Sequence, residues 1–350
     1  MLSKKTVLIT GSQGFIGSYV CSELLENHYN VIGVDNYSKY GKVTRRHDSH
    51  ENFELIEMDC TNNDFVERLK DYEFNYIIAG AAMIGGISYF HKYAYDLLAT
   101  NERIVSNTFD LAIQQFQKKS LEKIVVLSSS MVFENSNFWP TPESEINKCP
   151  PPFSTYGFQK LACEYFAKGA FEQYKLPFTI VRPFNCIGVG EEDAIGEHEM
   201  MSGNVKLTLS HVVPDLITKC LKGQNPLHIF GDGNQVRHYT NGKDIANGIK
   251  ICMEHQDAKN EDFNISTGTS TTVLELAKMI WQKINPDETF SYESDTPFEH
   301  DVQKRIPSVE KAKNILGFEA KISLEDSLNE VIEWMTKNME KNNEITRKNY

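Results

Sequence analysis

The chain has 350 residues, of which 40% are hydrophobic and 24% charged, a composition typical of an ordinary globular protein. Its formal net charge of −12 repels polyanions at long range, which excludes nucleic acid as the main partner. No run approaches the roughly eighteen apolar residues of a membrane span, and the seven cysteines show no C-x-x-C spacing. We therefore expect a cytoplasmic protein with free thiols, no metal site and no membrane partner.

The first predicted strand, Thr6–Ile9, runs directly into a glycine-rich turn. Gly11, Gly14 and Gly17 follow it at a spacing that gives a tight reversal, close approach of the backbone to a pyrophosphate, and close packing of helix on strand. A helix that begins near Phe15 would direct its free N–H groups and its positive dipole end at the phosphates. This segment predicts a dinucleotide-binding turn.

The second predicted strand, Asn30–Val34, strengthens this interpretation because it ends at an acidic residue, Asp35. A carboxylate at this place can accept hydrogen bonds from the hydroxyls of the adenosine ribose. It would also repel a 2′-phosphate, so we expect NAD rather than NADP as the cofactor.

Strand-like runs then alternate with amphipathic helical stretches such as Ser18–Asn27 and Ile104–Gln117. This alternation predicts βαβ crossovers, and hence an α/β fold with a Rossmann-type, doubly wound parallel sheet and helices on both faces. The further strands are expected at Phe53–Glu57, Asn75–Ala79, Lys123–Leu127 and Pro177–Val181.

The character of the sequence changes after Arg182. Residues 188–203 are acidic and rich in Gly, Glu and Met, which predicts a long loop that belongs to a site. Short strands at Leu227–Phe230 and Asp262–Ile265 then alternate with helices, the last at Leu324–Lys341. We expect a Rossmann domain over residues 1–186 plus about 237–266, a smaller C-terminal α/β lobe over 187–236 and 267–341, and a frayed polar tail over 342–350.

A tyrosine and a lysine four residues apart, Tyr156 and Lys160, are the candidate catalytic pair. On a helix they stand on one face, one turn apart, so the ammonium would favour the phenolate form of the tyrosine and make it a competent base. The predicted strand that ends near Leu127 is followed by three serines, and Ser129 could hold the same substrate hydroxyl.

These motifs together resemble the extended short-chain dehydrogenase/reductase family, in its nucleotide-sugar epimerase/dehydratase branch, from about Lys5 to Trp334. The resemblance implies a catalytic triad of Ser129, Tyr156 and Lys160, NAD as cofactor, and a nucleotide-diphosphate sugar as substrate. It also implies a homodimer formed through a helical bundle. The NAD-binding residues that we expect are Gly11, Gln13, Gly14, Phe15, Ile16, Gly17, Asp35, Asn36, Asp59, Cys60, Gly80, Ala81, Ala82, Asn101, Tyr156, Lys160 and Phe184.

The same resemblance implies a set of residues on the substrate side. Arg237, in a Gly-Asp-Gly-Asn-Gln-Val-Arg segment, and Arg305 would clamp the diphosphate, since a bidentate arginine supplies both energy and register. The full set is Gly85, Gly86, Ser130, Met131, Asn185, His211, Val212, Arg237 and Arg305.

The residues at two positions limit which reactions of this branch the chain could catalyse. Sugar 4,6-dehydratases of this branch carry an Asp-Glu pair where this chain has Ser130 and Met131, and neither an alcohol nor a thioether is a competent acid or base near neutral pH. Dehydration is therefore disfavoured. The segment around His211 is similar to that of GDP-fucose synthase, in which a histidine protonates the sugar; the partner cysteine of that enzyme would fall at Met131.

The hypothesis that follows is an NAD-dependent nucleotide-sugar 4-epimerase, an isomerase that acts through a transient 4-keto sugar. Three enzymatic alternatives remain open: a nucleotide-sugar 4-dehydrogenase, a decarboxylase, and a GDP-sugar 3,5-epimerase-like enzyme. A non-catalytic NAD-sensing protein is a further alternative, disfavoured because both Tyr156 and Lys160 are present.

Overall fold

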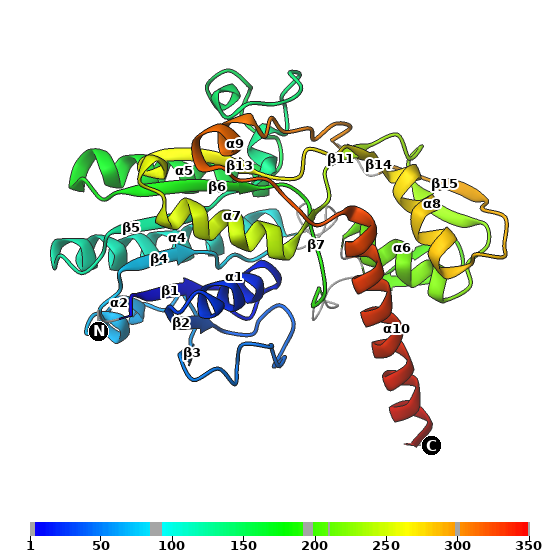
Figure 1. Ribbon diagram of the computed structural model, residues 1–350, viewed down its shortest axis with the longest axis horizontal. Coiled ribbons are helices and arrows are strands. Elements are labelled where there is room, and N and C mark those ends of the chain that lie inside the picture. The colour runs from blue at the N-terminus through cyan, green and yellow to red at the C-terminus, as the bar shows by residue number, and fades with distance from the viewer. Residues whose placement is uncertain (1–3, 85–92, 192–198, 209–210, 298–301, 349–350) are drawn as a thin grey trace.

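A seven-stranded parallel sheet lies at the centre of the molecule (Figure 1). The computed structural model describes residues 4–84, 93–191, 199–208, 211–297 and 302–348. The strand order is β13-β6-β5-β4-β1-β2-β3, with all neighbours parallel, so the order reverses between β1 and β4. The strands are β1 (Thr6–Thr10), β2 (Asn30–Asp35), β3 (Phe53–Glu57), β4 (Tyr76–Ala79), β5 (Lys123–Leu127), β6 (Phe178–Pro183) and β13 (Glu261–Ile265), each within two residues of its predicted bounds.

Helices cover both faces of this sheet, as the alternation of strands and helices predicts (Figure 1). Successive residues of a strand point to opposite faces, so Val7 and Ile9 pack into one core while Leu8 packs into the other. The doubly wound fold is therefore confirmed. The first core includes α1 (Phe15–Glu26), α7 (Gly242–Glu254) and α9 (Glu310–Leu316), and the second includes α2 (Phe65–Leu69), α4 (Ala94–Gln117) and α5 (Thr155–Tyr174).

A third apolar core lies beyond the carboxyl edge of the sheet, around Ile217, Leu276 and Trp281. It joins α6 (Val212–Leu221), α8 (Val273–Ile284) and the first part of α10 (Leu324–Lys348) to β10 (Leu227–Phe230). We propose that it is the core of the expected smaller lobe. The remaining short strands are β7 (Cys186–Ile187), β11 (Val236–Arg237), β12 (Thr240–Asn241), β14 (Thr271–Thr272) and β15 (Tyr292–Asp295), which pair as β7–β12, β11–β14 and β10–β15.

Three segments differ from the sequence-based expectation. Helix α4 begins at Ala94, ten residues early, because Leu97 and Asn101 extend its buried face. The expected loop at 188–203 is wrong in its last part, where β8 (Glu199–Ser202) and β9 (Val205–Thr208) form an antiparallel hairpin. Helix α10 continues to Lys348, so residues 342–348 are helical rather than frayed; Glu344, Arg347 and Lys348 are good helix formers. Among the described helices, none has the length and apolar character needed to cross a membrane.

Candidate active site

A cavity of about 680 Å³ opens at the carboxyl edge of the sheet, where the strand order reverses. In open α/β sheets this crevice is where ligands bind. The cavity brings together the turn after β1, the ends of β2, β4, β5 and β6, the start of α5, and α6 with β10 and β11 of the other core. Segments far apart in the sequence therefore share one site.

The glycine turn after β1 exposes its backbone because side chains at these positions would clash with the turn itself. Gly11 has φ of +78°, and an added Cβ on Gly17 would lie 2.0 Å from the Gly11 carbonyl oxygen. At the end of β1, Thr10 Oγ1 accepts hydrogen bonds from the backbone N–H groups of Gly80 (3.1 Å) and Ala81 (3.2 Å), which follow the neighbouring strand β4. These contacts hold the two strand ends together, and the bare backbone surface fits a dinucleotide pyrophosphate.

Asp35, at the end of β2, lies in this cavity beside the glycine turn. Its carboxylate accepts hydrogen bonds from the backbone N–H groups of Gln13 (2.9 Å) and Tyr37 (2.8 Å). Burial raises the pKa of Asp35, and these two N–H groups oppose the shift. The carboxylate is thus fixed at the end of the strand, where it suits ribose hydroxyls and opposes a 2′-phosphate.

The proposed catalytic triad also lies in this cavity. Tyr156 and Lys160 line it from the first turns of α5, and the Lys160 Nζ lies 6.0 Å from the centre of the Tyr156 ring. Lys160 donates a hydrogen bond of 2.9 Å to the carbonyl oxygen of Leu127, which aligns α5 with the end of β5. Ser129 caps a short 3-10 helix, where its Oγ accepts from the N–H of Met131 (3.2 Å). Met131 packs against Tyr156.

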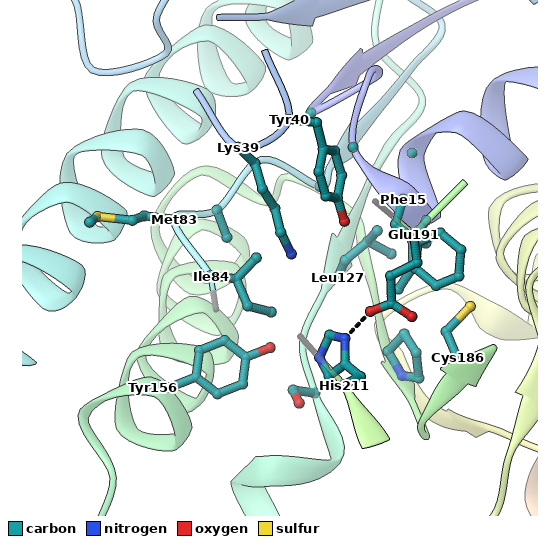
Figure 2. A pocket seen from close by; sticks show the side chains of 18 of the residues that line it. Phe15, Lys39, Tyr40, Met83, Ile84, Leu127, Tyr156, Cys186, Glu191 and His211 are labelled. Atoms are coloured by element: carbon teal, nitrogen blue, oxygen red, sulfur yellow. Dashed lines mark hydrogen bonds and ion pairs between the residues drawn. The ribbon is translucent and has the colours of Figure 1, made fainter. Parts of the chain in front are cut away.

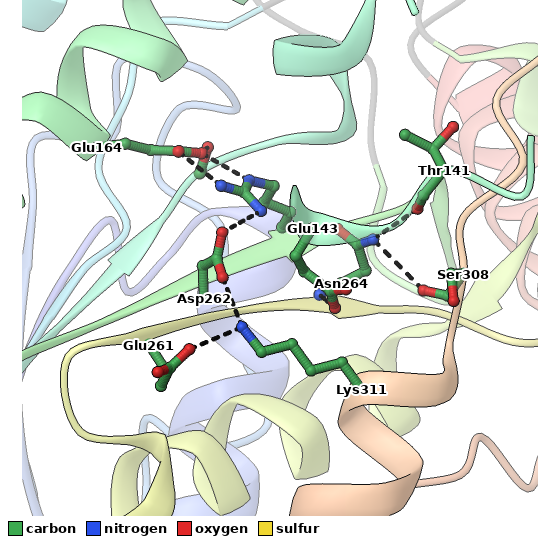
Figure 3. Close-up of polar contacts among 10 residues, drawn as sticks. Thr141, Glu143, Glu164, Glu261, Asp262, Asn264, Ser308 and Lys311 are labelled. Atoms are coloured by element: carbon green, nitrogen blue, oxygen red, sulfur yellow. Dashed lines mark hydrogen bonds and ion pairs between the residues drawn. The ribbon is translucent and has the colours of Figure 1, made fainter. Parts of the chain in front are cut away.

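A buried ion-pair network anchors α5, the helix that carries Tyr156 and Lys160 (Figure 3). Glu164, two turns after Tyr156, accepts two hydrogen bonds of 2.7 Å from Arg182 on β6, and both side chains are fully buried. The same guanidinium pairs with Asp262 on β13 at 2.8 Å. Ser128 Oγ donates to Glu164 at 2.6 Å, so the network also fixes the residue before Ser129.

Two arginines line the part of the cavity that faces the third core. Arg237 is buried, and its Nη1 donates to the carbonyl oxygen of Val236 (3.0 Å). The backbone N–H of Arg305 donates to the same carbonyl at 3.1 Å, which keeps the two arginines close together. Next to Arg237, His238 bonds to the Thr267 carbonyl at 2.7 Å, and burial lowers its pKa, so this histidine is a neutral structural group.

A histidine and a carboxylate face Tyr156 across the cavity (Figure 2). His211 Nδ1 contacts a carboxylate oxygen of Glu191, which is itself buried. The Glu191 charge raises the pKa of His211 and favours the imidazolium form. Lys39 and Tyr40, which also line the cavity, were missed by sequence reasoning, because the loop between β2 and β3 has no periodic pattern.

Arg45, from the same loop, joins the two sides of the cavity. Its Nε donates to the carbonyl oxygen of Gln13 in the glycine turn (3.0 Å), and its Nη1 donates to the carbonyl oxygen of Gly190 (2.9 Å). One residue earlier, the Val189 carbonyl accepts from Tyr19 on α1 at 3.0 Å. Segment 189–191 is therefore tied to the glycine turn and, through Glu191, to His211.

The structure brings most of the predicted residues to this one cavity and leaves two beside it. Asn101 instead holds the loop after β4, through hydrogen bonds to the backbone N–H (2.6 Å) and carbonyl (2.9 Å) of Met83, and Phe184 packs with Val132 and Phe133 behind the site. Gly85 and Gly86 lie outside the described residues. Those lining the cavity are Gly11, Gln13, Gly14, Phe15, Ile16, Gly17, Asp35, Asn36, Asp59, Cys60, Gly80, Ala81, Ala82, Ser129, Ser130, Met131, Tyr156, Lys160, Asn185, His211, Val212, Arg237 and Arg305.

Comparisons with known proteins agree with this geometry. Residues 7–266 match the NAD dependent epimerase/dehydratase family. A putative UDP-glucose 4-epimerase of Methanocaldococcus jannaschii is 30% identical over 95% of this chain and 99% of its own length. UDP-glucuronic acid decarboxylase 1 of Xenopus tropicalis is 27% identical over 96% of this chain and 73% of its own length.

Two solved structures are similar over nearly the whole chain. The UDP-glucose 4-epimerase of Thermotoga maritima, solved with UDP-glucose, has a TM-score of 0.80 and 31% identity and covers 95% of this chain and 99% of its own. MoeE5, solved with UDP-glucuronic acid and NAD, has a TM-score of 0.77 and 25% identity, with the same coverage.

Proposed function

Because this chain belongs to the NAD dependent epimerase/dehydratase family, we propose that it is a nucleotide-sugar 4-epimerase. It is an enzyme, and its cofactor is NAD. The observation that carries the proposal is that Ser129, Tyr156 and Lys160 share one cavity with the glycine turn and two arginines. Ser130 and Met131 add no acid or base beside the triad, which supports a reaction without net dehydration.

In the proposed reaction, the Tyr156 oxygen takes the proton of the sugar 4-hydroxyl. The Lys160 ammonium stabilises the phenolate by its charge, and Ser129 Oγ holds the same sugar oxygen. NAD supplies the chemistry of accepting a hydride from carbon 4 and returning it. The 4-keto sugar rotates so that its opposite face receives the hydride, and Tyr156 then returns the proton to the oxygen at carbon 4. The reaction therefore inverts carbon 4 with no net oxidation.

The two arginines would hold the diphosphate so that the sugar can turn without leaving. We expect Arg237→Ala to raise the KM for a nucleotide sugar about 10- to 100-fold, since a hydrogen bond to a charged group contributes about 1.5–3 kcal/mol. Steady-state kinetics measure the change. Lys304→Ala is the matched control, because this exposed cation next to Arg305 does not line the cavity. An unchanged KM for Arg237→Ala would assign the diphosphate to other residues.

The Glu191–His211 pair favours a second candidate, a 3,5-epimerase-like reaction. An imidazole paired with a carboxylate can move a proton to or from a carbon next to the 4-ketone. Two other reactions remain possible outcomes of the experiment below. Similarity to UDP-glucuronic acid decarboxylases supports decarboxylation, and the NAD site supports net oxidation at carbon 4.

The test is to incubate the purified protein with a panel of nucleotide sugars in D2O, with and without added NAD, and to identify the products by NMR. Interconversion of 4-epimers without added oxidant and without deuterium on carbon is the expected result, because the hydride never exchanges with solvent. Deuterium at a carbon next to carbon 4 would instead support the second candidate. Accumulation of NADH, or loss of carbon dioxide, would overturn both in favour of a dehydrogenase or a decarboxylase.

We also propose that the protein works as a homodimer, through the exposed face of α4 and α5. Several aromatic side chains lie exposed on this face, Tyr95, Phe158 and Tyr165 among them. A groove between the two helices is lined by both of them. Light scattering should then give twice the 40.0 kDa chain mass.

A further inference from the structure

A buried asparagine on the edge strand of the central sheet has no role in the chemistry above. Asn264 lies on β13 between Phe263 and Ile265, whose side chains pack into the first core. Successive residues of a strand point to opposite faces, so Asn264 points away from that core, and it is fully buried. A buried amide is costly unless it has polar partners, so its partners indicate what it holds in place.

The amide of Asn264 joins two backbone segments that are far apart in the sequence (Figure 3). Its Nδ2 donates to the carbonyl oxygens of Thr141 (3.1 Å) and Ser308 (3.4 Å). Both partners are acceptors, so only the N–H side of the amide can satisfy them. The backbone N–H of Asn264 donates to the Glu143 carboxylate at 2.9 Å, which fixes the segment around Thr141 beside β13.

The second of these segments carries Arg305. The chain around Arg305 is irregular, with isolated strand bridges on either side of it. The N–H of Thr141 donates to the carbonyl oxygen of Ile306 (2.8 Å), and the N–H of Ser308 donates to the carbonyl oxygen of Thr141 (2.8 Å). Arg305 therefore lies directly before backbone that Thr141 holds, and Thr141 is itself held by Asn264.

The position of this backbone matters because a guanidinium binds a diphosphate by paired hydrogen bonds of fixed geometry. On one side, the N–H of Arg305 donates to the carbonyl oxygen of Val236. On the other side, the chain is held through Thr141 and the amide of Asn264. Without that amide, two carbonyl oxygens would lose a donor inside the protein, and the segment would have to shift to find another.

We propose that Asn264 is a positioning residue for the diphosphate site, and this inference rests on the proposed function. Asn264 does not line the cavity, so it acts on the ligand through Arg305. Its two N–H donors hold the backbone that carries the guanidinium. The contribution of Arg305 to diphosphate binding therefore depends on the amide of Asn264.

Calorimetry with UDP and GDP on the NAD-loaded protein measures this dependence without turnover, and the tighter ligand is used for all variants. Asn264→Asp keeps the size of the side chain and removes both N–H donors, so the Kd should rise at least about fivefold. Asn314→Asp is the matched control, because it makes the same change at an exposed position of α9 outside the cavity. Its Kd should stay within about twofold of that of the unaltered protein.

A double-mutant cycle separates positioning of Arg305 from a general structural role. If Asn264 acts through Arg305, Asn264→Asp should raise the Kd by less than about twofold in a protein that already carries Arg305→Ala. A purely structural role, or repulsion of the diphosphate by the new carboxylate, would weaken binding by the same factor in both backgrounds. Asn264→Ser, which retains one donor and adds no charge, takes the place of Asn264→Asp in the cycle if that variant does not fold.

Each outcome of the cycle decides between the proposals. An unchanged Kd in the folded Asn264 variants, or equal factors in the two backgrounds, would overturn the positioning role and leave the proposed function intact. If Arg305→Ala alone leaves the Kd unchanged, Arg305 is not a diphosphate clamp, and the role of Asn264 fails with it. If the unaltered protein binds neither UDP nor GDP, the nucleotide-sugar proposal itself fails.

Discussion

Replacing Tyr156 by phenylalanine is expected to lower kcat about 10²- to 10⁴-fold, the range that a positioned acid–base group contributes. Only the hydroxyl is removed, so the ring still packs against Met131 and Leu97, and the cavity keeps its shape. Rapid-quench or steady-state assays on a substrate found in the NMR panel measure the effect.

Measuring ligand affinity distinguishes a catalytic role of the Tyr156 hydroxyl from a role in maintaining the structure of the site. Phe replacement should leave the Kd for NAD and for the nucleotide sugar within about threefold, because the glycine turn, Asp35 and the two arginines are unchanged. Tyr165→Phe is the matched control, since this tyrosine lies on the same helix outside the cavity, and the substitution keeps its ring on the face proposed for the dimer. Undiminished turnover in Tyr156→Phe would show that another group removes the proton.

The second large effect concerns stability. Glu164→Ala should lower the free energy of unfolding by about 3–5 kcal/mol, because it leaves the fully buried Arg182 without its two-point partner. Asp262 still contacts the guanidinium from one side, but the Glu164 side of Arg182 is fully buried, so its N–H groups there would lose their acceptors. Urea denaturation followed by circular dichroism measures the loss.

The control for this measurement is a glutamate on the same helix whose side chain is exposed to solvent. Glu172 lies exposed on the same helix, and Glu172→Ala should change stability by about 0.5 kcal/mol or less. Glu164→Gln keeps the shape and removes the charge, so its loss should fall between the two. A Glu164→Ala protein as stable as the Glu172→Ala protein would show that the buried pair is not needed to hold α5 against β6.

Much of the fold could be predicted because its signals are local. Val7, Leu8 and Ile9 alternate between two cores within a single strand, and the glycine spacing specifies the turn that follows. Tyr156 and Lys160 share a helix face by their spacing alone, and the alternation of strands and helices determines a parallel sheet. Each of these inferences needs only a few consecutive residues.

The contacts that complete the site join segments that no local pattern relates. Arg45 and Gly190 are 145 residues apart, and Glu191 and His211 are 20 residues apart with the β8–β9 hairpin between them. Phe184 shows the reverse case: the motif predicts its place in the chain, whereas packing with Val132 and Phe133 directs its ring away from the cavity. Long-range geometry of this kind follows from tertiary packing and not from spacing.

The bridge that Arg45 makes between Gln13 and Gly190 would affect the order of ligand release in the proposed reaction. In the proposed reaction, the 4-keto sugar cannot be reduced again if the sugar or the dinucleotide leaves the cavity before the hydride returns. Because Arg45 connects the turn proposed for the dinucleotide with a segment on the side proposed for the sugar, release of either ligand through movement of Arg45 would also loosen the contacts around the other, and in the proposed reaction this would keep both ligands in place until the hydride returns.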